Sequence, residues 1–423
     1  MLVRFRKVIV LIPALTLLIA CGGNSGDLLS QTSGNTDPNL IAKADDQGRI
    51  AYVSDDFQIW TVKPDGSNRL KITQGDSKYT WPGWSPAADM LSYSSFSGGA
   101  ADEKRDSLHV ARAEGTSQVQ LFENSVEDKP VFRISSPHYA LWSPDGEHLA
   151  FVVRDDEMKT LYLADSSGLM NPQELTEGKS VSIDWSHDSE TLLVRRESDL
   201  LRAEINESSA LVSVGLVSPK HRMSSWSPTS KMIGMIEPGV GGDALTVSSA
   251  TGYLKRQLTA VSGNAAFMWS PQGDRIAVGE SLDNEDYLLK RLKLVDVASG
   301  KSRILKETSI IAFFWAPDGS KIAYVAVGDS GENLQWRILD LDNGTDTQIA
   351  RFEPSHDQLI WYAFFDQFGE SHQVWSPDST RIIFAGSLDQ ESTQDGSRIY
   401  IADLNDVGSL RVVGIGHLAT WSS

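Results

Sequence analysis

The sequence has 423 residues, enough for two or three domains or for one large domain built from repeats. Acidic residues outnumber basic ones 56 to 38, and the formal net charge is -18. Removal of an N-terminal signal with Arg4, Arg6 and Lys7 would take the mature charge to about -21. No Lys/Arg cluster offsets this charge, so we expect no nucleic acid among the partners. The single cysteine excludes a disulfide within the chain and any zinc site built from several cysteines.

Residues 1–20 have the pattern of an export signal. A basic start is followed by an apolar run from Val8 to Ile19 and then by Leu18-Ile19-Ala20-Cys21. This pattern resembles the bacterial lipobox, which implies that Cys21 becomes the lipidated first residue of the mature chain. The alternative is an ordinary signal peptide or anchor helix in which the cysteine is incidental. Because residue 22 is Gly and not Asp, lipobox sorting rules imply the outer membrane in a cell with two membranes, and otherwise the cell surface.

Residues 21–47 are rich in Gly, Ser, Asn and Asp and have little apolar pattern. Such a composition predicts a flexible linker between the lipidated cysteine and the folded body. We therefore divide the chain into a signal (1–20), a linker (21–47) and a folded domain (48–423).

An internal repeat dominates the rest of the sequence. Tryptophan followed by Ser or Ala, and usually by Pro, recurs every 41 to 60 residues. Most of these tryptophans precede a turn such as Ser-Pro-Asp-Gly and then a strand such as Ile-Ala-Tyr, which predicts a tight β-hairpin. The repeated tryptophans are Trp84, Trp142, Trp185, Trp226, Trp269, Trp315, Trp375 and Trp421.

Four short alternating strands per repeat, with no helical period after the signal, predict an all-β fold. The first Ile-Ala-Tyr strand (50–52) has no Trp strand before it, and the last Trp strand, at Trp421, has nothing after it. We expect the C-terminal strand to complete the first blade and to seal a single closed β-propeller. The count gives eight four-stranded blades. Seven is the alternative if the weak unit at Trp185 or Trp226 is not a blade.

The combination Ile-Ala-Tyr, Ile-Trp, Asp-Gly, Leu-x-Ile-Thr and Trp-Ser-Pro resembles the TolB-type repeat, which is similar to the WD repeat. The resemblance covers about residues 48 to 422 and extends to the propellers of the prolyl oligopeptidase and dipeptidyl peptidase families. Two features differ from these families: no α/β domain precedes the first blade, and no Gly-x-Ser-x-Gly nucleophile motif is present. The resemblance therefore predicts the fold and says little about activity.

The predicted strand order separates two faces, which we call the turn-bearing face and the insertion-bearing face. Short turns between the first and second strands, and between the third and fourth, emerge on the first. Long insertions emerge on the second, which makes it the expected binding face. The segment 356–372 on that face carries Trp361, Tyr362, Phe364, Phe365 and Phe368. These aromatic residues form either a platform that stacks on a sugar ring or anchors a protein, or a loop that folds down over its own blade.

Four histidines precede blade tryptophans by three to five residues: His138, His221, His372 and His417. In a closed ring we expect them around one channel mouth, where a divalent metal is a weaker alternative to hydrogen bonds with loop backbone. The segment 340–346 resembles a calcium loop but lacks the correctly spaced Gly and Glu, which favours a plain turn. Asp145, Asp318 and Asp378 of the Pro-Asp turns are read as turn residues and not as catalytic acids.

The favoured function is a non-enzymatic, lipid-anchored propeller of the cell envelope that binds a protein or polysaccharide at the insertion-bearing face. No nucleophile, base and orienting residue form a recognisable catalytic set, and no cofactor is expected. One alternative is a glycan lyase or hydrolase that works at the histidine-lined mouth. Another is an accessory subunit of an envelope complex, in the manner of TolB.

Overall fold

A computed structural model describes residues 2–4, 9–11, 48–96, 104–126, 139–155, 158–205, 209–221, 223–284, 286, 288–328, 331, 333–388, 396–406 and 408–422. Within the predicted signal only the short hairpin of β1 (Leu2–Arg4) and β2 (Ile9–Leu11) is described. The rest of the signal, Cys21 and the linker lie outside the described residues. Among the residues that are described, no helix is both long and apolar enough to cross a bilayer.

The described chain is built almost entirely from antiparallel four-stranded units. Each unit is named here after the tryptophan at the end of its first strand. The Trp84 unit contains β6 (Lys78–Trp84), β7 (Met90–Phe96), β8 (Lys104–Arg112) and β9 (Val119–Val126). The Trp142 unit contains β10 (Tyr139–Trp142), β11 (His148–Asp155), β12 (Met158–Asp165) and β13 (Gln173–Gly178).

The next two units repeat this order. The Trp185 unit contains β14 (Val181–Trp185), β15 (Thr191–Arg196), β16 (Asp199–Glu204) and β17 (Leu211–Leu216). The Trp226 unit contains β18 (Ser225–Trp226), β19 (Met232–Gly239), β20 (Gly242–Ser249) and β21 (Lys255–Ala260). Both of the weakest sequence repeats therefore fold as complete four-stranded sheets.

The remaining strands form one 13-stranded sheet because some long strands pass from one unit into the next. In order they are β22 (Ala265–Trp269), β23 (Arg275–Glu280), β24 (Leu289–Asp296), β25 (Ser302–Trp315), β26 (Lys321–Val327), β27 (Leu334–Asp340), β28 (Asp346–Pro354), β29 (Arg381–Leu388), β30 (Arg398–Asp403), β31 (Leu410–Trp421), β3 (Ile50–Ser54), β4 (Ile59–Val62) and β5 (Leu70–Lys71). For example, β25 is the last strand of the Trp269 unit and the first strand of the Trp315 unit. Trp375 itself is held to β29 by an isolated bridge with Ile382.

The two ends of the folded chain pair with each other. Strand β31 is antiparallel to β3, with Ile50 opposite Trp421 and Tyr52 opposite Ala419. The backbone N–H of Ser422 also donates to the carbonyl of Arg49 over 2.8 Å. The predicted pairing of the C-terminal strand with the first strand is therefore present.

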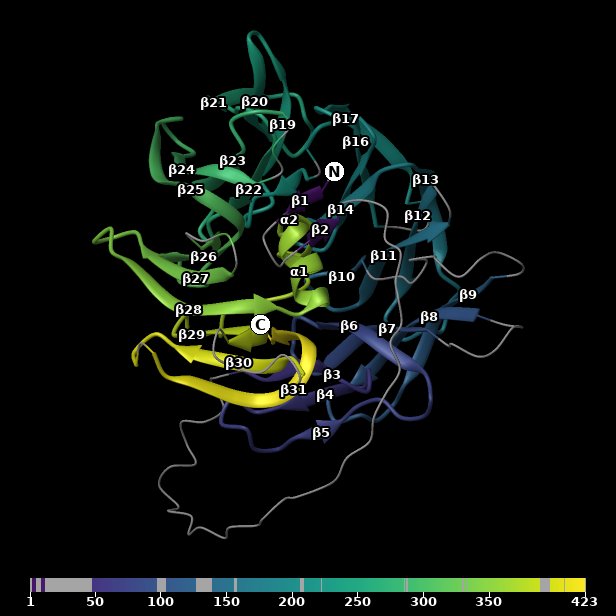
Figure 1. Cartoon of the computed structure of the whole chain (residues 1–423). Helices are drawn as coiled ribbons and strands as arrows, with labels where there is room; N and C mark the ends of the chain where they lie inside the picture. Colours follow the sequence, from purple (N-terminus) through teal and green to yellow (C-terminus); the bar gives the residue numbers. More distant parts are fainter. Residues whose placement is uncertain are drawn as a thin grey trace.

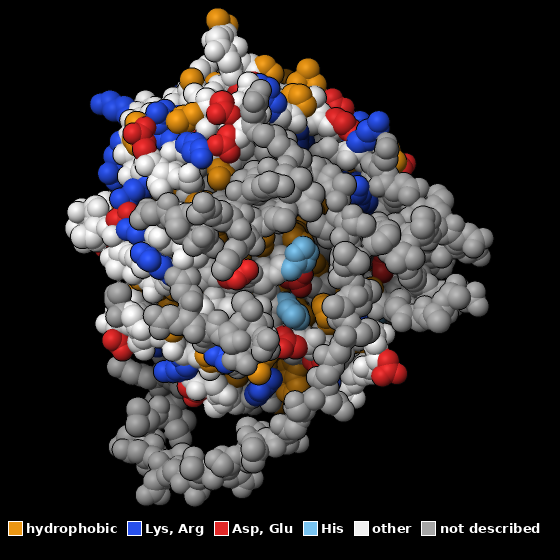
Figure 2. Space-filling model, in the orientation of Figure 1, with side chains coloured by type: hydrophobic (Ala, Val, Ile, Leu, Met, Phe, Trp, Pro, Cys, Tyr) orange, Lys and Arg blue, Asp and Glu red, His pale blue; other side chains and the backbone are white. Residues whose placement is uncertain are grey.

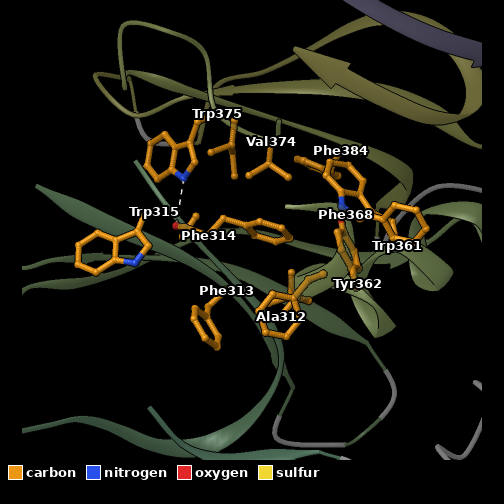
Figure 3. Packing of buried hydrophobic residues seen from close by; sticks show 14 of the residues in the cluster. Ala312, Phe313, Phe314, Trp315, Trp361, Tyr362, Phe368, Val374, Trp375 and Phe384 are labelled. Atoms are coloured by element: carbon orange, nitrogen blue, oxygen red, sulfur yellow. Dashed lines mark hydrogen bonds between the residues drawn. The ribbon is translucent and has the colours of Figure 1, made fainter. Parts of the chain in front are cut away.

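The repeated tryptophans join neighbouring units. Each is buried, and several indole N–H groups donate to a backbone carbonyl of the preceding unit. Trp185 Nε1 donates to Leu141 O over 3.1 Å, and Trp375 Nε1 donates to Phe314 O over 3.2 Å (Figure 3). A buried aromatic ring contributes apolar area at every junction, and at Trp142, Trp185, Trp315 and Trp375 the indole N–H also has a hydrogen-bond partner.

The Pro-Asp turns form as predicted and also contact one another. In the Trp142 unit the Asp145 carboxylate accepts hydrogen bonds from the Ser143 hydroxyl (2.5 Å) and from the backbone N–H of Glu147 (2.9 Å), while Gly146 takes a φ of +76°. The next turn along the ring reaches back, because the Ser189 hydroxyl accepts from the N–H of Asp145 over 2.9 Å. Asp145 is thus a turn residue, as expected.

The segment 340–346 is likewise a hairpin turn between β27 and β28. The Asp340 carboxylate accepts from the backbone N–H groups of Asp342 and Asn343 over 3.0 and 3.1 Å. These local bonds account for the side chain, in agreement with the plain-turn interpretation.

Figure 1 shows the units arranged around a centre, with the two short helices α1 (His356–Ala363) and α2 (Phe365–Phe368) lying in the middle. The helices belong to the insertion between β28 and Trp375. The centre of the insertion-bearing face is therefore occupied by the chain's own segment, which is where a functional site has to be sought.

Candidate functional site

The central insertion, which we call the plug, comprises residues 355–372. Its first helix is fixed at its start: the Ser355 hydroxyl accepts from the N–H of Gln358 (3.2 Å) and donates to the carbonyl of His417. The Gln358 side-chain oxygen accepts from the N–H of Ala385 over 3.0 Å. A capped helix start that is also bonded to β29 and β31 gives the plug a defined position.

The aromatic residues of the plug are core residues. Trp361, Tyr362, Phe365 and Phe368 are fully or almost fully buried, whereas Phe364 is half-buried. Phe365 packs against Phe313 with ring centroids 4.7 Å apart, and the Tyr362 ring meets Trp336 edge-on at 5.6 Å. The interpretation of these residues as an exposed stacking platform is therefore wrong, because their rings are already covered by the blades.

The plug reaches well beyond its own blade. Phe368 stacks on Trp81 of the Trp84 unit with ring centroids 4.8 Å apart and planes 14° apart, and it meets Tyr139 of the Trp142 unit edge-on at 5.7 Å. Trp81 adopts a φ of +53°, which is unfavourable for a bulky residue. The alternative, a loop that folds down, is therefore correct. The segment covers more than its own blade, however, because it also contacts the Trp84 and Trp142 units.

The predicted histidines that the structure describes have different surroundings. His221 is buried, with Nε2 3.1 Å from Asp243 Oδ2 and Nδ1 accepting from the N–H of Ala265 over 3.1 Å. His372 is also buried, with Nδ1 2.8 Å from Ser371 Oγ and its ring against Trp361. His138 lies outside the described residues.

Burial sets the charge of two of these histidines. It lowers the pKa of His372 to about 3, and it lowers the pKa of His221, an effect that the hydrogen bond to Asp243 opposes. A metal binds the neutral form of imidazole, so what speaks against a shared metal site is that each of these two rings already has a protein partner of its own. In the part of the chain that the structure describes, three such ligand groups approach one another only at Asp145, Glu147 and His148, on an exposed turn.

Of the three predicted histidines that the structure describes, His417 alone is partly exposed, with 27% of its side chain accessible. Its Nε2 lies 3.6 Å from Asp55 Oδ1, and its ring lies 5.1 Å from that of Phe57. Burial raises the pKa of Asp357, at the start of α1, and the nearby His417 and His356 oppose that shift. We call Asp55, Phe57, His356, Asp357 and His417 the mouth cluster.

Figure 2 shows histidine side chains near the middle of this face with acidic side chains beside them. Burial raises the pKa of Asp55 as well, and the neighbouring His417 opposes the shift. Carboxylates and imidazoles around one aromatic ring can accept and donate hydrogen bonds to a peptide or to sugar hydroxyls. The sequence pointed to His417 but not to the other four residues of the cluster. The signals that could have revealed them are Asp-Asp-Phe in a loop of the insertion-bearing face and His-Asp at the start of the helix.

One serine and histidine pair is close enough to suggest catalysis. Ser95 Oγ lies 2.9 Å from His109 Nε2, and the His109 ring stacks on Tyr93 with centroids 5.5 Å apart. Burial lowers the pKa of His109 to about 4, and Ser95 is itself buried. A covered nucleophile beside so weak a base fits a structural hydrogen bond better than acyl transfer.

The sequence did not reveal a second polar group, which is buried between two neighbouring units. The Asp184 carboxylate, on β14, accepts from the backbone N–H of Trp226 over 2.6 Å. Burial raises the pKa of Asp184 well above its usual value, and the charge of Glu370 at the end of the plug adds to the shift. Because Asp184 sits next to a blade tryptophan in the sequence, it reads as part of a core strand.

No protein-family model matches this chain, and neither does any curated protein sequence. Among solved structures, a dihydro-heme d1 dehydrogenase, NirN, matches with a TM-score of 0.59 and 12% identity over 92% of this chain and 76% of that chain. An oligogalacturonate lyase in complex with manganese matches with a TM-score of 0.53 and 14% identity over 85% and 98%.

Prolyl endopeptidases match with a TM-score of 0.51 and 14% identity over 81% of this chain and 50% of theirs. TolB from Acinetobacter baumannii also matches, with a TM-score of 0.41 and 15% identity over 79% and 83%. Likeness at such identities shows the fold alone. The chain is an all-β protein with a β-propeller fold of the kind that its TolB-like repeats predicted.

Proposed function

We propose that the protein is a lipid-anchored β-propeller of the bacterial cell envelope that binds a protein or an envelope polysaccharide at its mouth cluster and has no enzymatic activity of its own. The observation that carries the proposal is the contrast on the insertion-bearing face. The aromatic residues of the plug are buried, and the partly exposed polar groups of the mouth cluster, including His356 and Asp357 at the start of the plug, lie beside them. A binding propeller usually presents polar groups on loops that a rigid scaffold holds in place.

The proposed ring has eight blades and is closed. Pairing of Ile50 with Trp421 supports the closure between the last and first strands. The remaining junction lies between the unit of Trp421, which contains β31, β3, β4 and β5, and the Trp84 unit. Two hydrogen bonds cross it: Gln118 Nε2 donates to Ile72 O over 2.6 Å, and Thr61 Oγ1 donates to Ala113 O over 3.3 Å. Closure holds the mouth cluster together, because Asp55 and His417 come from opposite ends of the folded chain.

The anchor belongs to the proposal as well. It rests on the lipobox-like Leu18-Ile19-Ala20-Cys21 and places the protein at the outer membrane or periplasm of a cell with two membranes, or otherwise at the cell surface. A role as an accessory subunit of an envelope complex is one form of this binding function. The lyase or hydrolase alternative has less support, because His221 and His372 are buried with partners of their own.

Photo-crosslinking in the cells that make the protein tests the binding site. A benzophenone amino acid at position 356, in the mouth cluster, is compared with one at position 342, an equally exposed position on the turn-bearing face. We expect a discrete adduct at 356 that disappears in an Asp55→Asn/His417→Gln background, and none at 342. Equal adducts at both positions, or none at 356, would contradict the proposal, and shortening of a polysaccharide by the purified protein would favour the enzyme.

A further inference from the structure

The folded domain receives the linker on its turn-bearing face. Ile50 at the start of β3 pairs with Val62 at the end of β4, so the chain enters at the end of the unit from which the β4–β5 turn leaves. A Cβ at Gly48 would lie 3.0 Å from Pro377 Cγ, and Pro377 belongs to the Ser-Pro-Asp turn after Trp375. The linker therefore joins the ring beside the turns, on the side opposite to the mouth cluster.

Two turns on this same face carry large, exposed apolar side chains. Leu169 and Met170, in the turn after β12, are 88% and 71% exposed. Tyr253 and Leu254, in the turn after β20, are 89% and 78% exposed. Strands β12 and β20 are both third strands of their units, so both turns project from the same face of the propeller.

The apolar turns are held in place by the units behind them. Gly252, with a φ of +81°, lies so close to β17 that a Cβ there would come 2.5 Å from Val214 O. Gly168, with a φ of +68°, packs in the same way on Val119. Because the glycines face the neighbouring strand, the apolar side chains of the turn point outward, where water is a poor solvent for them.

We propose that the turn-bearing face rests on the lipid bilayer that holds Cys21, with Leu169, Met170, Tyr253 and Leu254 entering the headgroup region. This inference rests on the proposed lipid anchor. A linker of about 27 Gly/Ser-rich residues has a root-mean-square span of about 30 Å, which keeps the ring near the bilayer so that weak insertion is enough. Tyrosine and long aliphatic side chains are the residues that membrane interfaces accept.

The charge of this face indicates which lipid headgroups it can contact. The chain has a formal net charge of -18, and turns of this face carry exposed carboxylates such as Asp318 and Asp342, which repel anionic headgroups. We therefore infer that the surface fits a zwitterionic bilayer and not an anionic one. The orientation turns the mouth cluster away from the anchoring membrane, toward the compartment in which a partner is met.

A fluorescence experiment on the full, lipidated protein tests this orientation. Cys21 is the only cysteine and is consumed by the lipid, so Met170→Cys or Tyr253→Cys supplies a unique thiol for a polarity-sensitive dye. Val240→Cys is the matched control, because Val240 is equally apolar and exposed but lies at the opposite end of β20. In phosphatidylcholine vesicles with a lipid-borne quencher, we expect quenching about threefold stronger at 170 and 253 than at 240.

The outcomes separate the inference from the anchor on which it rests. If the mass of the purified protein lacks a diacylglyceryl group and the protein does not float with vesicles, the anchor is refuted. A protein that floats but is quenched equally at all three positions, or most at 240, overturns the orientation alone. Dye at 253 that is unquenched in vesicles yet shielded in intact envelopes reveals a protein occupant and also overturns it. When the dye is at position 170, we expect Tyr253→Ser/Leu254→Ser to weaken its quenching. We also expect phosphatidylglycerol in the vesicles to weaken quenching of the dye at position 170 and at position 253.

Discussion

The aromatic part of the plug, from Trp361 to Phe368, lies beside the mouth cluster, which takes in His356 and Asp357 at the start of the plug, and the two differ in character. The plug holds four aromatic rings with almost no exposure, joined to several blades by ring contacts. The mouth cluster has acidic and imidazole groups around the single ring of Phe57, and its His417 and Asp55 stay partly exposed to solvent. Aromatic richness in an insertion therefore measures how much apolar area it can bury, whereas a binding site is found where polar groups remain accessible.

The largest expected effect comes from breaking the plug. Trp361→Ala removes a fully buried indole that packs on Phe314 with ring centroids 5.8 Å apart, so we expect a loss of about 3–5 kcal/mol in the free energy of unfolding. Urea titration followed by tryptophan fluorescence and circular dichroism measures it. Phe364→Ala, in the same segment but half-buried, is the control and should cost much less. Equal losses would show that the buried rings of the plug do not stabilise the fold more than its half-buried ones.

A medium effect is expected from acid. Burial holds the pKa of His372 at about 3, below its unfolded value, so the unfolded state binds the proton first. The stability contribution of this neutral histidine is therefore complete above about pH 6.5 and falls by up to about 1.4 kcal/mol per pH unit as the pH drops toward 3. His109, with a pKa of about 4, adds to the loss in the same direction.

His372→Phe separates the contribution of the plug from that of other groups. An aromatic ring fits beside Trp81, Trp361 and Phe368 but cannot take a proton. We expect the difference in unfolding free energy between pH 7 and pH 5 to shrink by about 2 kcal/mol in this variant. His417→Gln, at the exposed mouth, is the control and should keep most of the wild-type loss. A pH dependence that is the same in all three proteins would place the acid-sensitive groups elsewhere.

The sequence was informative about the ring because its signals are local. Trp-Ser-Pro-Asp-Gly specifies a strand, a turn and a returning strand within a dozen residues, and the observed bonds of Asp145 and Ser143 are those the turn chemistry predicts. The pairing of Ile50 with Trp421 also followed, because each end lacked what the other supplies. Both depend on repetition, which makes every unit a check on the others.

The site was less predictable because it depends on where an insertion comes to rest. The residues at 361–368 are compatible with an exposed platform and with a buried plug, and only the three-dimensional fit against Trp81, Phe313 and Trp336 decides between them. The histidines stand at equivalent repeat positions, yet His221 contacts Asp243, whereas His372 is buried among aromatic rings. Asp55 and His417 are 362 positions apart in the chain and meet only because the ends pair.

The smallest effect on stability is expected at the mouth cluster. His417 and Asp55 are 3.6 Å apart and partly exposed, and solvent-screened pairs of this kind contribute about 0–1 kcal/mol. Asp55→Asn/His417→Gln should therefore leave the urea midpoint almost unchanged, because neither side chain supports the core. The same double variant removes the crosslink at position 356 if the mouth binds the partner, so a loss of binding without a loss of stability identifies a binding surface. A variant that unfolds as readily as Trp361→Ala would instead make the mouth cluster part of the fold, and the contrast with the plug would disappear.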